Sequence, residues 1–116
     1  MSVALRLLIN TTLKEGVSVT SLGEFMGRAS AAVAAKEPGT TVYNWWRGED
    51  GAVIFEDGYR DEAAFGIHMA NMTDSGMLGE WMSLVDVTTV QALGEVSDAT
   101  RGMLAGLGAV HYAKGA

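Results

Sequence analysis

Four polar side chains have the chemistry to transfer a proton or to hydrogen-bond a ligand. Asp57 and Tyr59 stand two residues apart in a segment with strand character, so their side chains share one face. His68 follows about two helical turns later, and an unperturbed imidazole titrates near neutrality, which suits a proton relay. Asn10 is an amide in an otherwise apolar strand. These four residues are the candidates for chemistry.

Each candidate also has a structural interpretation. His68 shares a helical stripe with Phe65, Met69 and Met72, and a single histidine in such a stripe is often a packed, hydrogen-bonded residue. A buried Asn10 amide must find partners or lose several kcal/mol. It can find them in the backbone at a strand end, so a ligand-facing role and a structural role both remain open.

Two adjacent tryptophans, Trp45 and Trp46, fall in a second predicted strand. Neighbours on a strand point to opposite faces, so one can pack under helices while the other lines the open face of the sheet. The candidates for contact with a ligand are Tyr43, Asn44, Trp46, Phe55, Phe65, Met72 and Trp81. The alternative is that these side chains fill the core or a dimer contact. Likewise, the methionines at 69, 72, 77 and 82 either wall an adaptable pocket or fill gaps.

Composition excludes several classes of site. The chain has no cysteine, which excludes thiol chemistry, and the spacing of His68 and His111 fits no transition-metal motif. No phosphate-binding glycine loop or GxSxG nucleophile elbow is present. A net charge of −6 disfavours nucleic acid, and no apolar run is long enough to span a membrane. We therefore expect a cytoplasmic protein without a metal or other cofactor, whose partners are proteins or small molecules.

The first half of the chain alternates between strand and helix patterns. Val3, Leu5, Leu7, Ile9, Thr11 and Leu13 fall on one face of an extended segment. A helical pattern follows, with Ser21 and Glu24 in the form of a capping box and an end near Lys36, before Pro38-Gly39. Strands are predicted over 40–47 and 52–59, joined by a turn at Glu49-Asp50-Gly51.

The second half begins with a helix that Asp61 can cap, and Asp74-Ser75 can start a further short helix. A β-branched run over 84–93 predicts another strand. Ser97 then opens a helix over 99–107 that Gly108 closes, before a final short strand over 109–113.

This order predicts an α+β fold of the ferredoxin-like type, a four-stranded antiparallel sheet with helices on one face. The 116 residues form a single domain, with the ferredoxin-like core in 1–96 and a helix–strand extension in 97–116. The uncovered face of the sheet would carry a tryptophan and branched side chains, too much apolar surface for a soluble monomer. We therefore expect a homodimer.

The segment EPGTTVYNWWRGEDGAVIFEDGYRDEAAFGIHMANM, residues 37–72, resembles the antibiotic biosynthesis monooxygenase family, which includes quinol monooxygenases. The likeness consists of EPGT, an aromatic strand, a turn, the acidic and aromatic run EDGYRDEAAF, and a helix with a central histidine. Residues 3–36 and 84–93 fit the family's first strand, first helix and last sheet strand. The resemblance implies a dimeric α+β barrel.

For chemistry, the resemblance implies oxidation of a phenolic or quinol-like aromatic substrate by O2 without flavin, haem or metal. The substrate anion reduces O2, and the radicals recombine to a peroxide that collapses to a quinone. Asn10, Asp57, Tyr59 and His68 would be the catalytic residues, with Asn10 as a donor to a phenolate oxygen. The family's best-understood quinone-forming members carry Asn and Trp on the strand before the second helix, where this chain has Phe55 and Tyr59.

That departure leaves two further hypotheses open. The protein could be a non-catalytic dimer that binds an apolar ligand or simply assembles. Haem binding and degradation, which needs a histidine able to ligate iron beside a tryptophan, fits less well because of Tyr59 and the position of His68.

Overall fold

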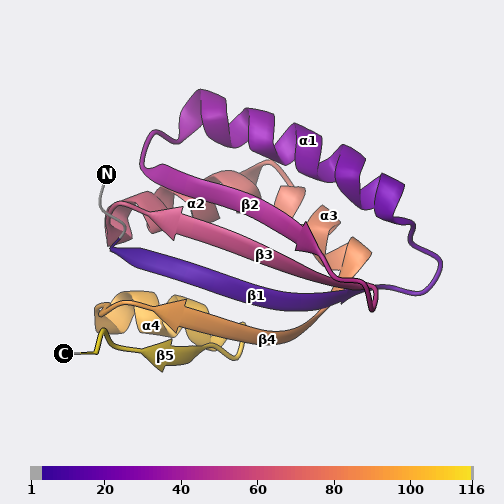
Figure 1. Cartoon of the computed structure of the whole chain (residues 1–116). Helices are drawn as coiled ribbons and strands as arrows, with labels where there is room; N and C mark the ends of the chain where they lie inside the picture. The colour runs from indigo at the N-terminus through magenta and orange to yellow at the C-terminus, as the bar shows by residue number, and fades with distance from the viewer. Residues whose placement is uncertain (1–3, 116) are drawn as a thin grey trace.

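A computed structural model describes residues 4–115 and shows one twisted sheet with helices packed against it (Figure 1). The elements in chain order are β1 (Leu5–Leu13), α1 (Val19–Lys36), β2 (Thr40–Arg47), β3 (Ala52–Tyr59), α2 (Glu62–Asp74), α3 (Met77–Leu84), β4 (Val85–Leu93), α4 (Asp98–Ala105) and β5 (Val110–Tyr112). This order confirms the predicted alternation of strands and helices in an α+β fold.

The sheet has five strands in the order β2-β3-β1-β4-β5, rather than the four predicted. The pairs β2–β3, β1–β3 and β1–β4 are antiparallel, whereas β5 runs parallel to β4. The sheet is therefore mixed, because the closing strand of the C-terminal extension joins it at the β4 edge. It remains open within the chain, with β2 and β5 at its two edges.

The strand β1 shows how sequence alternation sets the two faces of the sheet. Leu5, Leu7, Ile9 and Thr11 are buried, and the residues between them are only partly buried. The buried set packs against α1, whose Leu22 and Phe25 belong to the same core. Val3, predicted on this face, lies outside the described residues. Only one face of β1 is buried because α1, α2 and α3 cover only that face of the sheet (Figure 1).

Local capping fixes where the helices begin. Ser18 caps α1 by accepting a hydrogen bond from the Ser21 backbone N–H, so the helix starts before the predicted capping box. Asp61 caps α2 as predicted, accepting from the Ala64 N–H at 2.8 Å. Ser97 caps α4, also as predicted. The side chain of Asp61 thus fixes the start of the helix that carries His68.

The short helix α3 starts later than predicted. Its N-cap is Gly76, which has a φ of 80°, a backbone conformation that glycine adopts without steric cost. Asp74 still belongs to α2, and Ser75 accepts from the Met77 N–H. The turn between the two helices directs α3 across the end of the space between α2 and the sheet.

Candidate functional site

A cavity lies between the covered face of the sheet and the helices. The centre of a water-sized sphere can move through about 60 Å³ of it, more than the ~10–15 Å³ that a cavity needs to hold one water molecule. Its lining is mostly apolar: Leu7, Ile9, Phe25, Met26, Phe55, Phe65, Met69, Met72, Met77, Leu78, Trp81 and Leu107. Its polar lining consists of Tyr43, Asp57, Tyr59 and His68.

Asp57 and Tyr59 reach this cavity because they alternate with outward-facing residues along β3. Asp57 is 8% exposed and Tyr59 is fully buried. The Tyr59 hydroxyl donates to Asp57 Oδ2 at 3.2 Å. Burial raises the pKa of Asp57 to about 6, with His68 and the Tyr59 hydrogen bond acting in the opposite direction. A carboxyl group with this pKa is ionised at neutral pH and can still hold a proton for a short time.

The two tyrosines beside Asp57 are held in their neutral form. Burial, followed by the charge of Asp57, raises the pKa of Tyr59 well above its ordinary value. The same two causes raise the pKa of Tyr43. Their rings flank His68, with centroids 5.5 Å (Tyr43) and 5.6 Å (Tyr59) from the imidazole. Both hydroxyl groups therefore keep their protons around neutrality, and Tyr59 donates its proton to Asp57.

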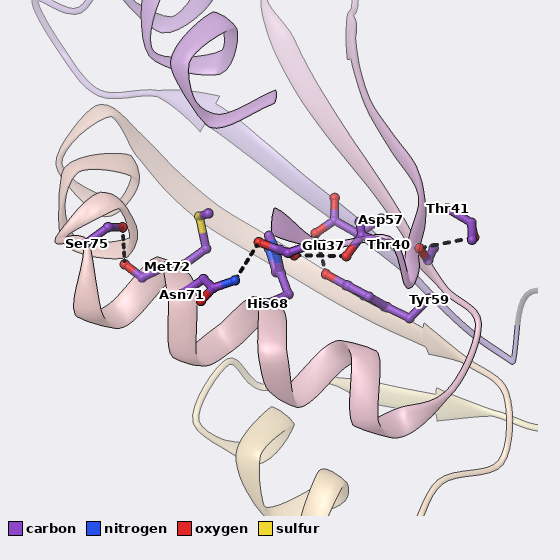
Figure 2. A network of polar contacts seen from close by, with 10 residues as sticks. Glu37, Thr40, Thr41, Asp57, Tyr59, His68, Asn71, Met72 and Ser75 are labelled. Atoms are coloured by element: carbon purple, nitrogen blue, oxygen red, sulfur yellow. Dashed lines mark hydrogen bonds and ion pairs between the residues drawn. The ribbon is translucent and has the colours of Figure 1, made fainter. Parts of the chain in front are cut away.

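Glu37 and His68 form a buried pair, of which His68 also lines the cavity. His68 Nδ1 lies 2.7 Å from Glu37 Oε1, and the side chains are 7% and 2% exposed. Thr40 Oγ1 donates to the same carboxyl oxygen at 2.9 Å, and Asn71 Nδ2 donates to Oε2 at 3.4 Å. Figure 2 shows this network between α2 and the segment that follows α1. With donors from three residues, the carboxylate is compensated despite its burial.

Glu37 and Asn71 are functional candidates that the sequence analysis missed. Glu37 follows the last residue of α1, and its N–H still bonds to the Val33 carbonyl. The EPGT run that begins at Glu37 was noted as part of the family resemblance, but no role was assigned to the carboxylate. The signal that could have identified it is the acidic residue of that run, just before the predicted strand 40–47.

Three predicted site residues lie on the opposite face of the sheet, away from the cavity. Asn10 Nδ2 donates to Thr89 Oγ1 at 2.8 Å, across β1 and β4. Trp46 Nε1 and Asn44 Nδ2 both donate to Glu56 Oε1, at 3.2 and 3.3 Å. Even-numbered residues of β1 face away from the helices, so Asn10 lies on the open face of the sheet, and its catalytic role stays a prediction.

The other eight predicted site residues do line the cavity: Tyr43, Phe55, Asp57, Tyr59, Phe65, His68, Met72 and Trp81. The question left open for the two tryptophans is also answered. Trp45 packs on the helix side, near Gly23 of α1, and Trp46 is 58% exposed on the open face. Because the two tryptophans are neighbours on one strand, their side chains lie on opposite faces of the sheet, as expected.

Four methionines, Met26, Met69, Met72 and Met77, contribute to the cavity wall. Met82, predicted with them, is 49% exposed and lies outside the lining. Unbranched thioether side chains adjust their shape more readily than branched ones. The methionine part of the wall can therefore adapt to an aromatic ligand. The rings of Phe55 and Trp81 pack edge to face, with their centroids 5.4 Å apart, and form a more rigid part of the wall.

Two further properties concern the described residues 4–115. They contain no cluster of three or more histidine, aspartate or glutamate side chains that could hold a metal ion. None of their helices is both long and apolar enough to cross a membrane.

Comparison with known proteins places this fold among solved structures. No family model matches the sequence, and no curated protein shows significant similarity to it. MupZ from Pseudomonas fluorescens superposes with a TM-score of 0.82 at 15% identity, over 97% of this chain and 90% of that one. PA3566 from Pseudomonas aeruginosa superposes with a TM-score of 0.64 at 20% identity, over 84% of this chain and 98% of that one.

A third similar structure carries a described activity. SnoaB from Streptomyces nogalater, a cofactor-independent oxygenase, has a TM-score of 0.66 at 13% identity, over 83% of this chain and 96% of that one. At these identities the likeness establishes a shared fold. It confirms the α+β fold expected from the resemblance, whereas the dimeric barrel stays a prediction.

Proposed function

We propose that this protein belongs to the antibiotic biosynthesis monooxygenase family and oxidises a phenolic or quinol-like aromatic substrate with O2, without a cofactor. The observation that carries the proposal is the carboxyl group of Asp57, buried in a cavity walled by aromatic and thioether side chains. Burial raises its pKa to about 6, close to the operating pH that favours a general base. The fold shared with SnoaB supports the reaction class.

In the proposed reaction, ionised Asp57 accepts the hydroxyl proton of the substrate. The phenolate transfers one electron to O2, and the substrate radical and superoxide combine at a ring carbon that carries hydrogen. Asp57 returns its proton to the peroxide, which loses water as the C–H and O–O bonds break and a carbonyl forms. O2 thus supplies one oxygen atom to the product and one to water. Tyr59 and His68 stabilise the charges that develop beside Asp57.

The test is O2 uptake with naphthohydroquinones, anthrones and single-ring phenols, with and without a chelator and after subtraction of the spontaneous oxidation. We expect uptake that survives chelation, increases as pH rises through about 6, and falls by roughly 10²–10⁴ in Asp57→Asn. Glu49→Gln, in an exposed turn, is the matched control. Ligand binding without any uptake across the panel would reject the oxygenase and favour a binding protein of the same fold.

We also propose that two copies of the chain associate through the open face of the sheet. Trp46 is 58% and Ile54 38% exposed there, next to each other in the β2–β3 register. A second copy would cover this apolar surface, and Asn10 and Asn44 would lie within the contact rather than at the cavity. Sedimentation velocity at micromolar concentration should show a dimer that Trp46→Glu dissociates. A native monomer under those conditions would refute the contact.

A further inference from the structure

Two acceptor atoms of the cavity have no partner. Tyr59 occupies Asp57 Oδ2, which leaves Oδ1 free, and Glu37 occupies His68 Nδ1, which leaves Nε2 free. Among the described residues, the one fully buried side-chain polar atom without a partner is His111 Nδ1. Asp57 Oδ1 and His68 Nε2 therefore retain open surface, and both residues line the cavity. They belong to side chains that are more than nine-tenths buried.

Glu37 determines what His68 presents to the cavity. A carboxylate accepts hydrogen bonds and donates none, so the proton of a neutral imidazole lies on Nδ1 and faces Glu37. Nε2 then carries a lone pair on the cavity side. Thr40 and Asn71 hold the carboxylate in place through their own hydrogen bonds. Glu37 is thus a positioning residue that keeps Nε2 as an acceptor.

We infer that the cavity selects a single aromatic ring with two hydroxyl groups, one donating to Asp57 Oδ1 and the other to His68 Nε2. The cavity volume of about 60 Å³ is smaller than the ~150 Å³ of an apolar cavity that binds benzene, so one ring enters when the methionine side chains move. The polar groups that it can meet are those of Tyr43, Asp57, Tyr59 and His68. That this ligand is the substrate rests on the proposed function, whereas its binding does not. A monohydroxylated ring would leave one buried acceptor unpaired, and that penalty gives the selectivity.

The first test measures affinity without turnover. Calorimetry under anaerobic conditions at pH 8 compares catechol, resorcinol and hydroquinone with phenol and dimethoxybenzene. We expect the best dihydroxybenzene to bind roughly tenfold or more tightly than phenol, and dimethoxybenzene to bind weakest. Asp57→Asn should abolish most of this preference, because its amide can present a donor to the cavity, and Glu49→Gln should keep it. Phenol binding as tightly as all three isomers would overturn the inference.

The second test measures the tautomer directly. The ¹⁵N chemical shifts of the native imidazole should show His68 protonated at Nδ1, and the resonances of Glu37→Gln should move toward a mixture of tautomers. Glu37→Gln should also lose severalfold of the preference for two hydroxyl groups. Native His68 protonated at Nε2 would refute the assignment, even if the variant fails to fold. Dihydroxybenzene selectivity without O2 uptake would instead reject the oxygenase and leave this inference standing.

Discussion

Replacing Asp57 with asparagine should stabilise the protein, and the gain should depend on pH. The pKa of Asp57 rises from 3.8 to about 6 on burial, and one pKa unit corresponds to about 1.4 kcal/mol. Keeping this side chain ionised in the folded protein therefore costs about 3 kcal/mol. The side chain is buried, so solvent screening does not reduce this value substantially. An asparagine side chain carries no charge, and its amide oxygen can still accept the hydrogen bond from the Tyr59 hydroxyl.

The sign of the pH dependence follows from the raised pKa. The folded protein binds the Asp57 proton more tightly than the unfolded chain does, so this contribution to stability is complete below pH ~3.8. It is lost as pH rises through about 6. The free energy of unfolding of Asp57→Asn minus that of the native protein should therefore increase by about 2.5 kcal/mol between pH 4 and 8.

Urea unfolding at fixed protein concentration across this pH range measures the difference. Subtracting the native curve removes the contributions of all other titrating groups that the two proteins share. Glu49→Gln, at an exposed position, should give a difference that stays flat with pH. A flat or decreasing difference for Asp57→Asn would show that the surroundings stabilise the Asp57 anion, and the reasoning about its raised pKa would fail.

Three further changes test the elements that position the site, each by urea unfolding. Glu37→Ala leaves one buried donor, on His68, and two half-buried donors, on Thr40 and Asn71, without an acceptor, and should cost roughly 3 kcal/mol. A loss below about 1 kcal/mol would contradict the network. Asp61→Ala removes the α2 cap and should cost about 1 kcal/mol; no loss would place the cap elsewhere. In Gly94→Ala, Cβ would lie 2.3 Å from the Ala4 carbonyl oxygen at a φ of +126°. This should cost about 2 kcal/mol or more, whereas Gly27→Ala, in open helical surroundings, should stabilise the protein.

Local patterns in the sequence were sufficient to predict most of the fold. The alternation in β1, the β2–β3 hairpin and the Asp61 cap depend on neighbouring residues, and the structure confirms each. The start of α1 was missed by about one turn because Ser18 and Ser21 both precede helical residues, and only the observed hydrogen bond distinguishes them. The fifth strand pairs parallel to β4, a contact that strand pattern alone does not specify.

The candidate site was harder to predict because its residues meet through long-range packing. Periodicity showed that Asp57 and Tyr59 share a face and that Asn10 lies opposite Leu7 and Ile9, but it did not show which face of β1 continues the face that carries Asp57. That outcome depends on the register between β1 and β3. Glu37 lies 31 residues before His68, and the turn that joins α1 to β2 brings them together. No local pattern of charge or hydropathy encodes such a contact.

The central place of β1 in the sheet affects how the protein folds during synthesis. Its partners are β3 and β4, and Arg6 pairs with Leu93. At about 5–20 residues per second, β1 leaves the ribosome roughly 4–17 s before its last partner exists. During that interval α1, the β2–β3 hairpin, α2 and α3 emerge, but the edge of β1 that pairs with β4 has no partner. Chaperone dependence should therefore be greatest for nascent chains that end before β4, and much lower once that strand has emerged.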